Sequence, residues 1–200
     1  MVRKQSNKKT GELRLIAGQW RGRKLPILTA EGLRPTTDRV RETLFNWLQF
    51  DIQGAQVADL FAGSGSLGFE AASRGAQQVT LIEMDKAAAQ QLKQNVSRLS
   101  APQINVIQQS ALDWLIAEST QHTKLDIVFI DPPFNKSLVS PTLDALKRGE
   151  WLHSDSLVYV ESERNLPPEV FNDFDILREK HHGQVSFRLL TPSTEETTHA

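Results

Sequence analysis

Mostly apolar residues gather in short runs along the middle of the chain, and longer amphipathic stretches separate these runs. The runs lie at 57–63, 79–85, 104–109 and 125–134. Runs that are apolar on both faces are typical of parallel strands, because crossover helices cover both sides of such a sheet. The pattern therefore predicts a βαβαβαβ arrangement in a Rossmann-like α/β fold, with right-handed connections that wind the sheet doubly.

The last third of the chain predicts the remaining strands of the sheet. A helix is expected near 137–147, followed by a strand at 157–163. Residues 174–190 are typical of two strands joined across His182 and Gly183. An antiparallel C-terminal hairpin would thus complete a mainly parallel, seven-stranded sheet.

The start of the chain has a different pattern. Residues 12–27 alternate partially between apolar and polar positions and are broken by Gly18 and Gly22, which predicts a twisted β-hairpin with basic residues on one side. Apolar positions at helical spacing after Pro35 predict a helix that packs on the body. We expect three parts: a basic N-terminal extension at 1–35, a Rossmann-like domain at 36–190 and a tail at 191–200.

Charge is distributed unevenly between these parts. The formal net charge is only −1. Through Arg41, however, the chain has eleven Lys and Arg residues against three acids, a net +8, whereas the rest has 12 basic and 21 acidic residues, a net −9. A basic segment on an acidic body predicts a polyanionic partner for the N-terminal part, with nucleic acid as the first candidate.

Composition and hydropathy argue against several other classes. The chain has no cysteine and its five histidines lack metal-ligand spacing, so we expect no metal site. It has neither an apolar leader nor an apolar run of about 18 residues, which favours a cytoplasmic protein without a membrane span. We expect a monomer.

A glycine-rich turn and a later carboxylate predict a nucleoside site. Gly63 and Gly65 follow the first strand of the domain and precede a helix, where the backbone can turn tightly and approach a ligand. Glu83 ends the second strand, where its carboxylate can accept both ribose hydroxyl hydrogens. The roles of two further sites stay open. Asp59, inside an apolar run, pairs with a ligand ammonium, caps the backbone or pairs with an arginine, and Ser110-Ala111 contacts an adenine or caps a helix.

Asp131-Pro132-Pro133-Phe134 follows the fourth strand, at the expected ligand crevice. Prolines donate no hydrogen bonds, so the Asp131 carboxylate and nearby carbonyls would be acceptors for a ligand amino group. Phe134 offers a face on which a base lifted out of its helix could stack. The alternative is a rigid turn with a core phenylalanine.

The motifs DLFAGSG, LIEMD and DPPF together resemble class I methyltransferases that act on exocyclic amines. RLIAGQWRGRKLP and LRPTTDRVRETLFNWL resemble the bacterial 16S rRNA (guanine(966)-N(2))-methyltransferases, and the resemblance extends from Arg14 to Leu190. It implies methyl transfer from S-adenosylmethionine, with S-adenosylhomocysteine as product, to the N2 amine of a guanine in 16S ribosomal RNA on the small ribosomal subunit.

The resemblance also assigns residues to roles. Catalysis would involve Asp131, Pro132, Pro133 and Phe134. Cofactor contacts would come from Asp59, Gly63, Gly65, Glu83, Ser110 and Ala111, and Thr36, Thr37 and Arg39 would lie on a segment that closes over the cofactor. RNA contacts would come from Arg21, Arg23, Lys24, Arg34 and Arg39. Among the four tryptophans, Trp20 is our candidate for an RNA contact because it lies in the basic hairpin.

Three alternatives remain to be weighed. A nicotinamide dehydrogenase would share the glycine turn and Glu83, but the sole tyrosine, Tyr159, lies inside a strand and leaves no obvious proton donor. A non-catalytic RNA-binding protein would give Glu83 and Asp131 no purpose. A DNA methyltransferase, or one acting on another RNA, would share the chemistry and differ in what the N-terminal segment binds.

Glu161 and Glu163 are explained as paired or solvated carboxylates and are left out of the site.

Overall fold

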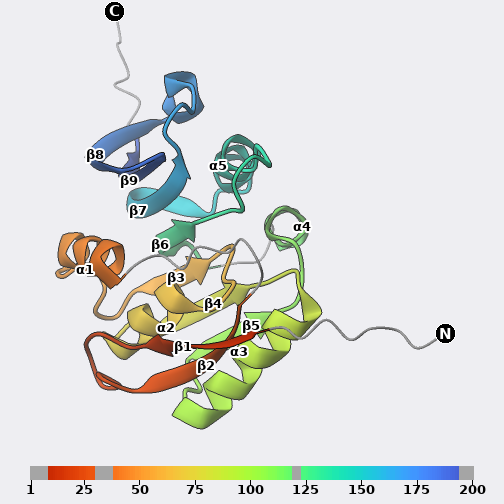
Figure 1. Ribbon diagram of the computed structural model, residues 1–200. Helices are drawn as coiled ribbons and strands as arrows, with labels where there is room; N and C mark the ends of the chain where they lie inside the picture. Colours follow the sequence, from red (N-terminus) through yellow and green to blue (C-terminus); the bar gives the residue numbers. More distant parts are fainter. Residues whose placement is uncertain (1–8, 30–37, 119–122, 194–200) are drawn as a thin grey trace, which may run out of the picture.

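The structure, a computed structural model, describes residues 9–29, 38–118 and 123–193 (Figure 1). Its centre is a seven-stranded sheet in the order β5-β4-β3-β6-β7-β9-β8. The strands are β3 (Gln56–Asp59), β4 (Gln78–Ile82), β5 (Ile104–Ile107), β6 (Leu125–Ile130), β7 (Leu152–Glu163), β8 (Phe174–His182) and β9 (Val185–Pro192).

Five strands, β3 to β7, are parallel, whereas β9 pairs antiparallel with both β7 and β8. The mainly parallel sheet with an antiparallel C-terminal hairpin is therefore confirmed. The strand order reverses between β3 and β6, because the chain first moves outward from β3 to β5 and then returns to the other side of β3. Ligands of such sheets bind at this reversal, beyond the carboxyl ends of the strands.

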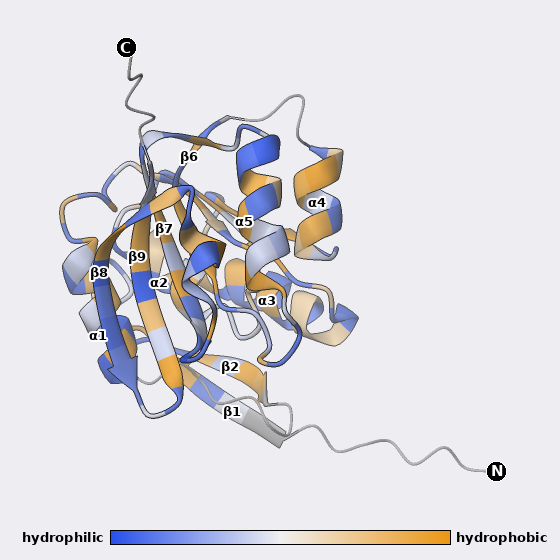
Figure 2. Ribbon diagram, turned by 90° about the horizontal axis from the view of Figure 1, so that it is seen from above, coloured by the Kyte–Doolittle hydropathy of each residue, from blue (hydrophilic) through white to orange (hydrophobic). Residues whose placement is uncertain are grey.

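Helices cover both faces of the sheet. They are α1 (Asp38–Trp47), α2 (Ser66–Ser73), α3 (Lys86–Leu99), α4 (Ala111–Ala117) and α5 (Val139–Arg148), with a 3-10 helix, η1 (Pro168–Phe171), before β8. Helices α1, α2 and α3 share one hydrophobic cluster with Val57, and α4 and α5 share a second cluster with Ala58. Neighbouring residues of β3 thus face opposite layers, as the alternation of side chains along a strand requires. Figure 2 shows that β8, by contrast, is hydrophilic, as suits its exposed position at the sheet edge.

The N-terminal segment forms the expected hairpin from β1 (Lys9–Arg14) and β2 (Lys24–Thr29). Leu13 and Leu25 oppose each other across the strands and are buried in the cluster that also contains the core of α1, α2 and α3. The side-chain amide of Asn95 in α3 donates a hydrogen bond of 2.9 Å to the carbonyl of Pro26. The hairpin therefore lies alongside α2 and α3 and shares their core (Figure 1).

The connection between β1 and β2 is fixed against the carboxyl-terminal half of α2. The buried carboxylate of Glu70 accepts hydrogen bonds from the backbone N–H groups of Ile16 (2.8 Å) and Ala17 (3.0 Å). Gly18 has a φ of +77°, and a Cβ there would come within 1.8 Å of the Ser73 carbonyl oxygen. Only glycine fits this approach, which explains the break in the alternating pattern.

No helix among the described residues is long and apolar enough to cross a membrane. Within the same part of the chain, no group of His, Cys, Asp or Glu side chains could hold a metal ion.

Candidate active site

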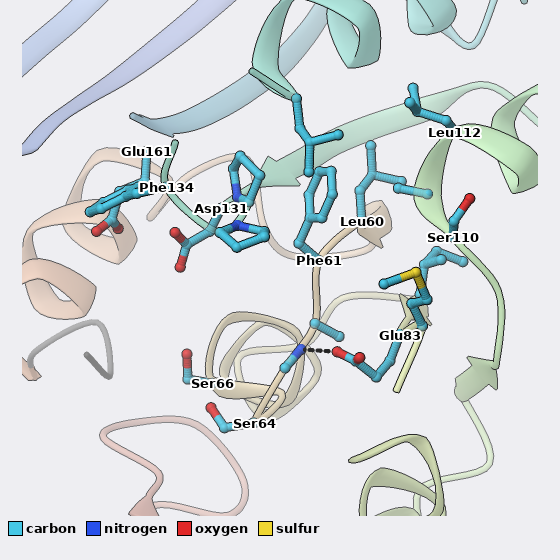
Figure 3. Close-up of a pocket in the computed structure, with 18 of the residues that line it drawn as sticks. Leu60, Phe61, Ser64, Ser66, Glu83, Ser110, Leu112, Asp131, Phe134 and Glu161 are labelled. Carbon is cyan, nitrogen blue, oxygen red and sulfur yellow. Dashed lines mark hydrogen bonds between the residues drawn. The ribbon is translucent and has the colours of Figure 1, made fainter. Parts of the chain in front are cut away.

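A pocket of about 870 Å³ opens beyond the carboxyl ends of β3, β4, β6 and β7. In Figure 3, Asp131, Phe134 and Glu161 lie on one side of this pocket, Glu83 and Ser110 on the other, and Ser64 and Ser66 below. The predicted catalytic and cofactor residues that line it are Gly63, Glu83, Ser110, Ala111, Asp131, Pro132, Pro133 and Phe134. The structure thus brings the two predicted halves of the site into one cavity.

Glu83 connects the glycine turn to the end of β4. Its two carboxylate oxygens accept backbone hydrogen bonds from Gly63 (2.8 Å) and Asp85 (2.7 Å). A carboxylate offers about four lone-pair sites, so acceptor capacity remains for ribose hydroxyls. Gly63 has a φ of +51°, and a Cβ there would meet only the Phe61 carbonyl oxygen, at an ordinary contact distance of 3.9 Å. The side chain at 83 and the bare backbone at 63 therefore suit a nucleoside that lies across the turn.

Gly65 and Gly68 have structural reasons to be glycine. Gly65 precedes α2 with a φ of +77°, and a Cβ there would come within 2.5 Å of the Phe69 ring. A Cβ at Gly68 would come within 2.1 Å of a methyl group of Leu81. Gly65 thus allows the turn before α2, and Gly68 allows α2 to pack closely on β4. Gly65 does not line the pocket, so its predicted cofactor contact is not supported by the lining.

Asp59 ends β3 and is buried behind the pocket rather than lining it. One carboxylate oxygen accepts a hydrogen bond of 3.1 Å from the backbone N–H of Gly68. Burial raises the pKa of Asp59 from 3.8 to about 7, and the charge of Glu83 adds to this, whereas hydrogen bonds from Gly68 and Phe61 lower it. The geometry favours the interpretation that Asp59 caps the start of α2.

The loop after β6 holds the predicted catalytic motif. Pro132 is buried and anchors the loop, while Asp131 is half-buried and Phe134 is 38% exposed. The carboxylate of Glu163 at the end of β7 accepts a hydrogen bond from the backbone N–H of Asn135, the next residue along. Both Asp131 and Phe134 line the pocket, so a carboxylate and an aromatic ring border the same cavity.

Ser110 and Ala111 line the pocket from the start of α4, and the Ser110 hydroxyl also accepts a hydrogen bond of 3.2 Å from the backbone N–H of Asp113. The serine therefore caps the helix, while its neighbour supplies an apolar wall. Arg39 is exposed at the start of α1 and does not line the pocket, although Val40 does. Thr36, Thr37 and Arg34 lie outside the described residues.

The predicted RNA contacts of the hairpin differ in exposure. Arg21, Arg23 and Lys24 are exposed, and Lys24 pairs with Glu12 at 2.8 Å. Trp20 is only 8% exposed and belongs to the hydrophobic cluster, with its backbone N–H bound to the Ser73 hydroxyl. Its ring is packed in the core, so it offers no stacking face and we do not carry it into the proposed RNA interface.

The hairpin connection lies at the opposite end of α2 from the pocket. Helix α2 begins at the glycine turn and ends at Ser73, whose carbonyl accepts a hydrogen bond of 2.7 Å from Gln19. Eight residues of helix extend about 12 Å. The hairpin connection is therefore separated from the pocket by about the length of this helix.

The sequence did not reveal the pocket-lining residues that come from the C-terminal part of the chain. Glu161 lies near the end of β7 and lines the pocket, together with His182, Val185 and Phe187 of the β8–β9 hairpin. The signal was available for Glu161, because β6 and β7 were both expected to end at the crevice. The hairpin residues required the strand order, which places the start of β9 against the end of β7.

A family model described as Conserved hypothetical protein 95 matches residues 13–191 of this chain. The ribosomal RNA small subunit methyltransferase D of Escherichia coli (strain K12) is 49% identical over 189 residues, 94% of each chain. This chain therefore belongs to the family that this model describes, together with ribosomal RNA small subunit methyltransferase D. The ribosomal RNA small subunit methyltransferase D of Haemophilus influenzae is also 49% identical, over 191 residues that cover 94% of this chain and 98% of the relative.

Solved structures of the family have the same fold. The Escherichia coli protein YhhF superposes with a TM-score of 0.83 at 48% identity and covers 92% of this chain and 100% of its own. A Haemophilus influenzae family member has a TM-score of 0.75 at 46% identity, covering 91% and 99%. A more distant protein, complexed with SAH, has a TM-score of 0.66 at 15% identity, covers 96% of this chain and 58% of its own, and shows a shared fold.

Proposed function

We propose that this chain transfers a methyl group from S-adenosylmethionine to the exocyclic N2 amine of guanine 966 in 16S ribosomal RNA, with the small ribosomal subunit as substrate. The observation that carries this proposal is one pocket lined by both Glu83 and the Asp131–Phe134 loop, in a chain 49% identical to ribosomal RNA small subunit methyltransferase D. The choice of guanine N2 at position 966 rests on the resemblance of the N-terminal stretches to the bacterial 16S rRNA (guanine(966)-N(2))-methyltransferases. We place the enzyme in the cytoplasm as a monomer.

The cofactor would occupy the Glu83 side of the pocket. Glu83 would accept the ribose hydroxyls, Gly63 would let the backbone approach, and Ser110 and Ala111 would bound the adenine. A pocket of about 870 Å³ is at the large end of the range for small-molecule sites, as a site for a nucleoside and a base should be. When bound, S-adenosylmethionine supplies an electrophilic methyl group on a sulfonium sulfur, which keeps the electron pair of the broken carbon–sulfur bond.

The target base would occupy the opposite side. Phe134 would stack on a base lifted out of its RNA helix, and the Asp131 carboxylate would accept a hydrogen bond from the N2 amine. The amine lone pair of guanine is delocalised into the ring, so an acceptor on its hydrogens turns the nitrogen toward a nucleophilic geometry. The prolines contribute carbonyl acceptors without competing N–H donors. Positioning and electrostatics would then supply most of the rate.

The experiment is a comparison of substrates with labelled cofactor. The protein is incubated with small ribosomal subunits that lack the modification, with protein-free 16S RNA and with duplex DNA. We expect label in the subunits, because the family resemblance favours the assembled particle. Label in DNA but not in subunits would replace the proposal with the DNA methyltransferase alternative, and absence of transfer to all three would contradict it.

A further inference from the structure

Asp131 and Glu161 occupy matching positions on neighbouring strands. The parallel register of β6 and β7 pairs Phe129 with Tyr159 and Ile130 with Val160. β6 ends at Ile130, so the residues that come next are Asp131, directly after β6, and Glu161 in β7. Neighbouring strands lie about 4.8 Å apart, and side chains at the same register level point to the same side. Both residues line the pocket, and Figure 3 shows them beside Phe134. Two carboxylates thus reach one ligand space from adjacent backbones.

Tyr159 holds the second of these carboxylates. Its hydroxyl donates a hydrogen bond of 3.2 Å to an Oε atom of Glu161, and its ring is fully buried. Burial raises the pKa of Tyr159 well above its ordinary value, and the charges of Glu161 and Asp131 raise it further. The phenol therefore keeps its proton and remains a donor. It fixes the direction of Glu161 with a single hydrogen bond, and a carboxylate can accept about four.

The hydrogen-bonding edges of the bases differ at the atom beside the amine. Guanine presents the N2 amine next to the N1–H group, so adjacent ring positions both donate. Adenine and cytosine present their amine next to a ring nitrogen with a lone pair, which a carboxylate would repel. A site with two adjacent carboxylates therefore fits the edge of guanine and disfavours the other two amino bases.

We propose that Glu161 is a specificity-determining residue that accepts the N1–H of the target guanine while Asp131 accepts the N2 amine. This role rests on the proposed function, because it assigns the second acceptor of the same base site. Glu161 would thereby select guanine over other amino bases and fix the direction in which the N2 amine meets the methyl group.

The test combines a protein variant with a base analogue. 2-Aminopurine keeps the exocyclic 2-amine of guanine but has a lone pair, not a hydrogen, at N1. Small subunits are reconstituted with 16S RNA that has either guanine or 2-aminopurine at the methylated position. Methyl transfer to each is then measured as kcat/KM for the native enzyme and for Glu161→Gln, whose amide can donate a hydrogen bond to the bare N1. Glu169→Gln, an exposed carboxylate on η1, is the matched control.

We expect Glu161→Gln to lower kcat/KM on guanine by about 10- to 100-fold, as the loss of a hydrogen bond to a charged group predicts. The native enzyme should disfavour 2-aminopurine by a similar factor. The variant should lose this preference, so that its two substrates differ by less than about threefold. Cofactor affinity of the variant, measured by calorimetry, should equal that of the native and control proteins.

Two results would overturn the proposal for Glu161. One is a native enzyme that methylates 2-aminopurine and guanine equally well, which needs no variant and so does not depend on how Glu161→Gln folds. The other is a variant that retains the native preference for guanine. Either result would leave the proposed function standing, whereas absence of methylation of guanine subunits by the native enzyme would contradict the proposed function itself.

Discussion

Replacing Asp59 with Asn should change how the stability of the protein depends on pH. The carboxyl is buried, and its pKa is raised from 3.8 to about 7 mainly by that burial. Between these two values the folded protein holds a proton that the unfolded chain has released, so stability falls as pH rises through this window. Asn is uncharged at every pH and can still accept the hydrogen bond from Gly68. The stability of the Asp59→Asn variant should therefore not fall through this pH window on account of residue 59.

The magnitude follows from the pKa values. The native protein should lose about 1.2 kcal/mol per pH unit from this one group between about pH 4.5 and 6.5, and roughly 2.5 kcal/mol between pH 5 and pH 8. The remaining titratable groups are common to both proteins. Their contributions cancel when the free energy of unfolding of the variant is subtracted from that of the native protein.

The assay is urea unfolding of both proteins at several pH values. The difference in unfolding free energy, native minus variant, should fall steadily from pH 5 to pH 8. For the control Asp51→Asn, at an exposed site, the difference should vary by less than about 0.5 kcal/mol. A flat difference for Asp59→Asn would refute the reasoning that burial of this carboxyl governs its charge. Repeating the series with saturating S-adenosylmethionine separates the two interpretations of Asp59, since an ammonium paired with it would reduce the slope.

Three further predictions concern the cofactor, the chemistry and the RNA. Glu83→Ala should weaken S-adenosylmethionine binding by about 1 to 3 kcal/mol in calorimetry, and unchanged affinity would remove Glu83 from the site. Asp131→Ala should keep cofactor affinity but lower single-turnover methyl transfer at least ~100-fold, and near-native turnover would contradict its role. Changing Arg21, Arg23 and Lys24 together to Ala should reduce the slope of log RNA affinity against log salt by roughly 2 to 3, while an unchanged slope would place the RNA contacts elsewhere.

The sheet and the main site motifs could be predicted from the sequence because their signals are local. Apolar runs with helical stretches between them require a parallel sheet, and residues that follow such runs must meet at its carboxyl edge. Glu83 and Asp131 therefore could be placed in one pocket before the structure was known. The antiparallel ending was likewise visible, because a Gly-containing break separates two short strands.

The parts that could not be predicted depend on packing between distant segments. Trp20 lies among arginines in the sequence, yet the hairpin connection folds against the end of α2 and buries its ring. Gly65 belongs to a ligand-binding pattern, yet the Phe69 side chain is what excludes a Cβ there. The sequence places Glu161 near the crevice, but it was interpreted as a paired or solvated carboxylate because the sequence does not give the strand register that sets it beside Asp131. Only the register of β6 and β7 reveals that pair.

Mass mapping of 16S RNA fragments tests the central claim most directly. Small subunits lacking the modification are incubated with the protein and S-adenosylmethionine, and the fragment that contains position 966 is digested to nucleosides. The proposed function predicts one added methyl group in this fragment, recovered as N2-methylguanosine. A methyl group on adenine, on another guanine fragment, or on the ring nitrogen of guanine would contradict the claim that this pocket positions the N2 amine of guanine 966.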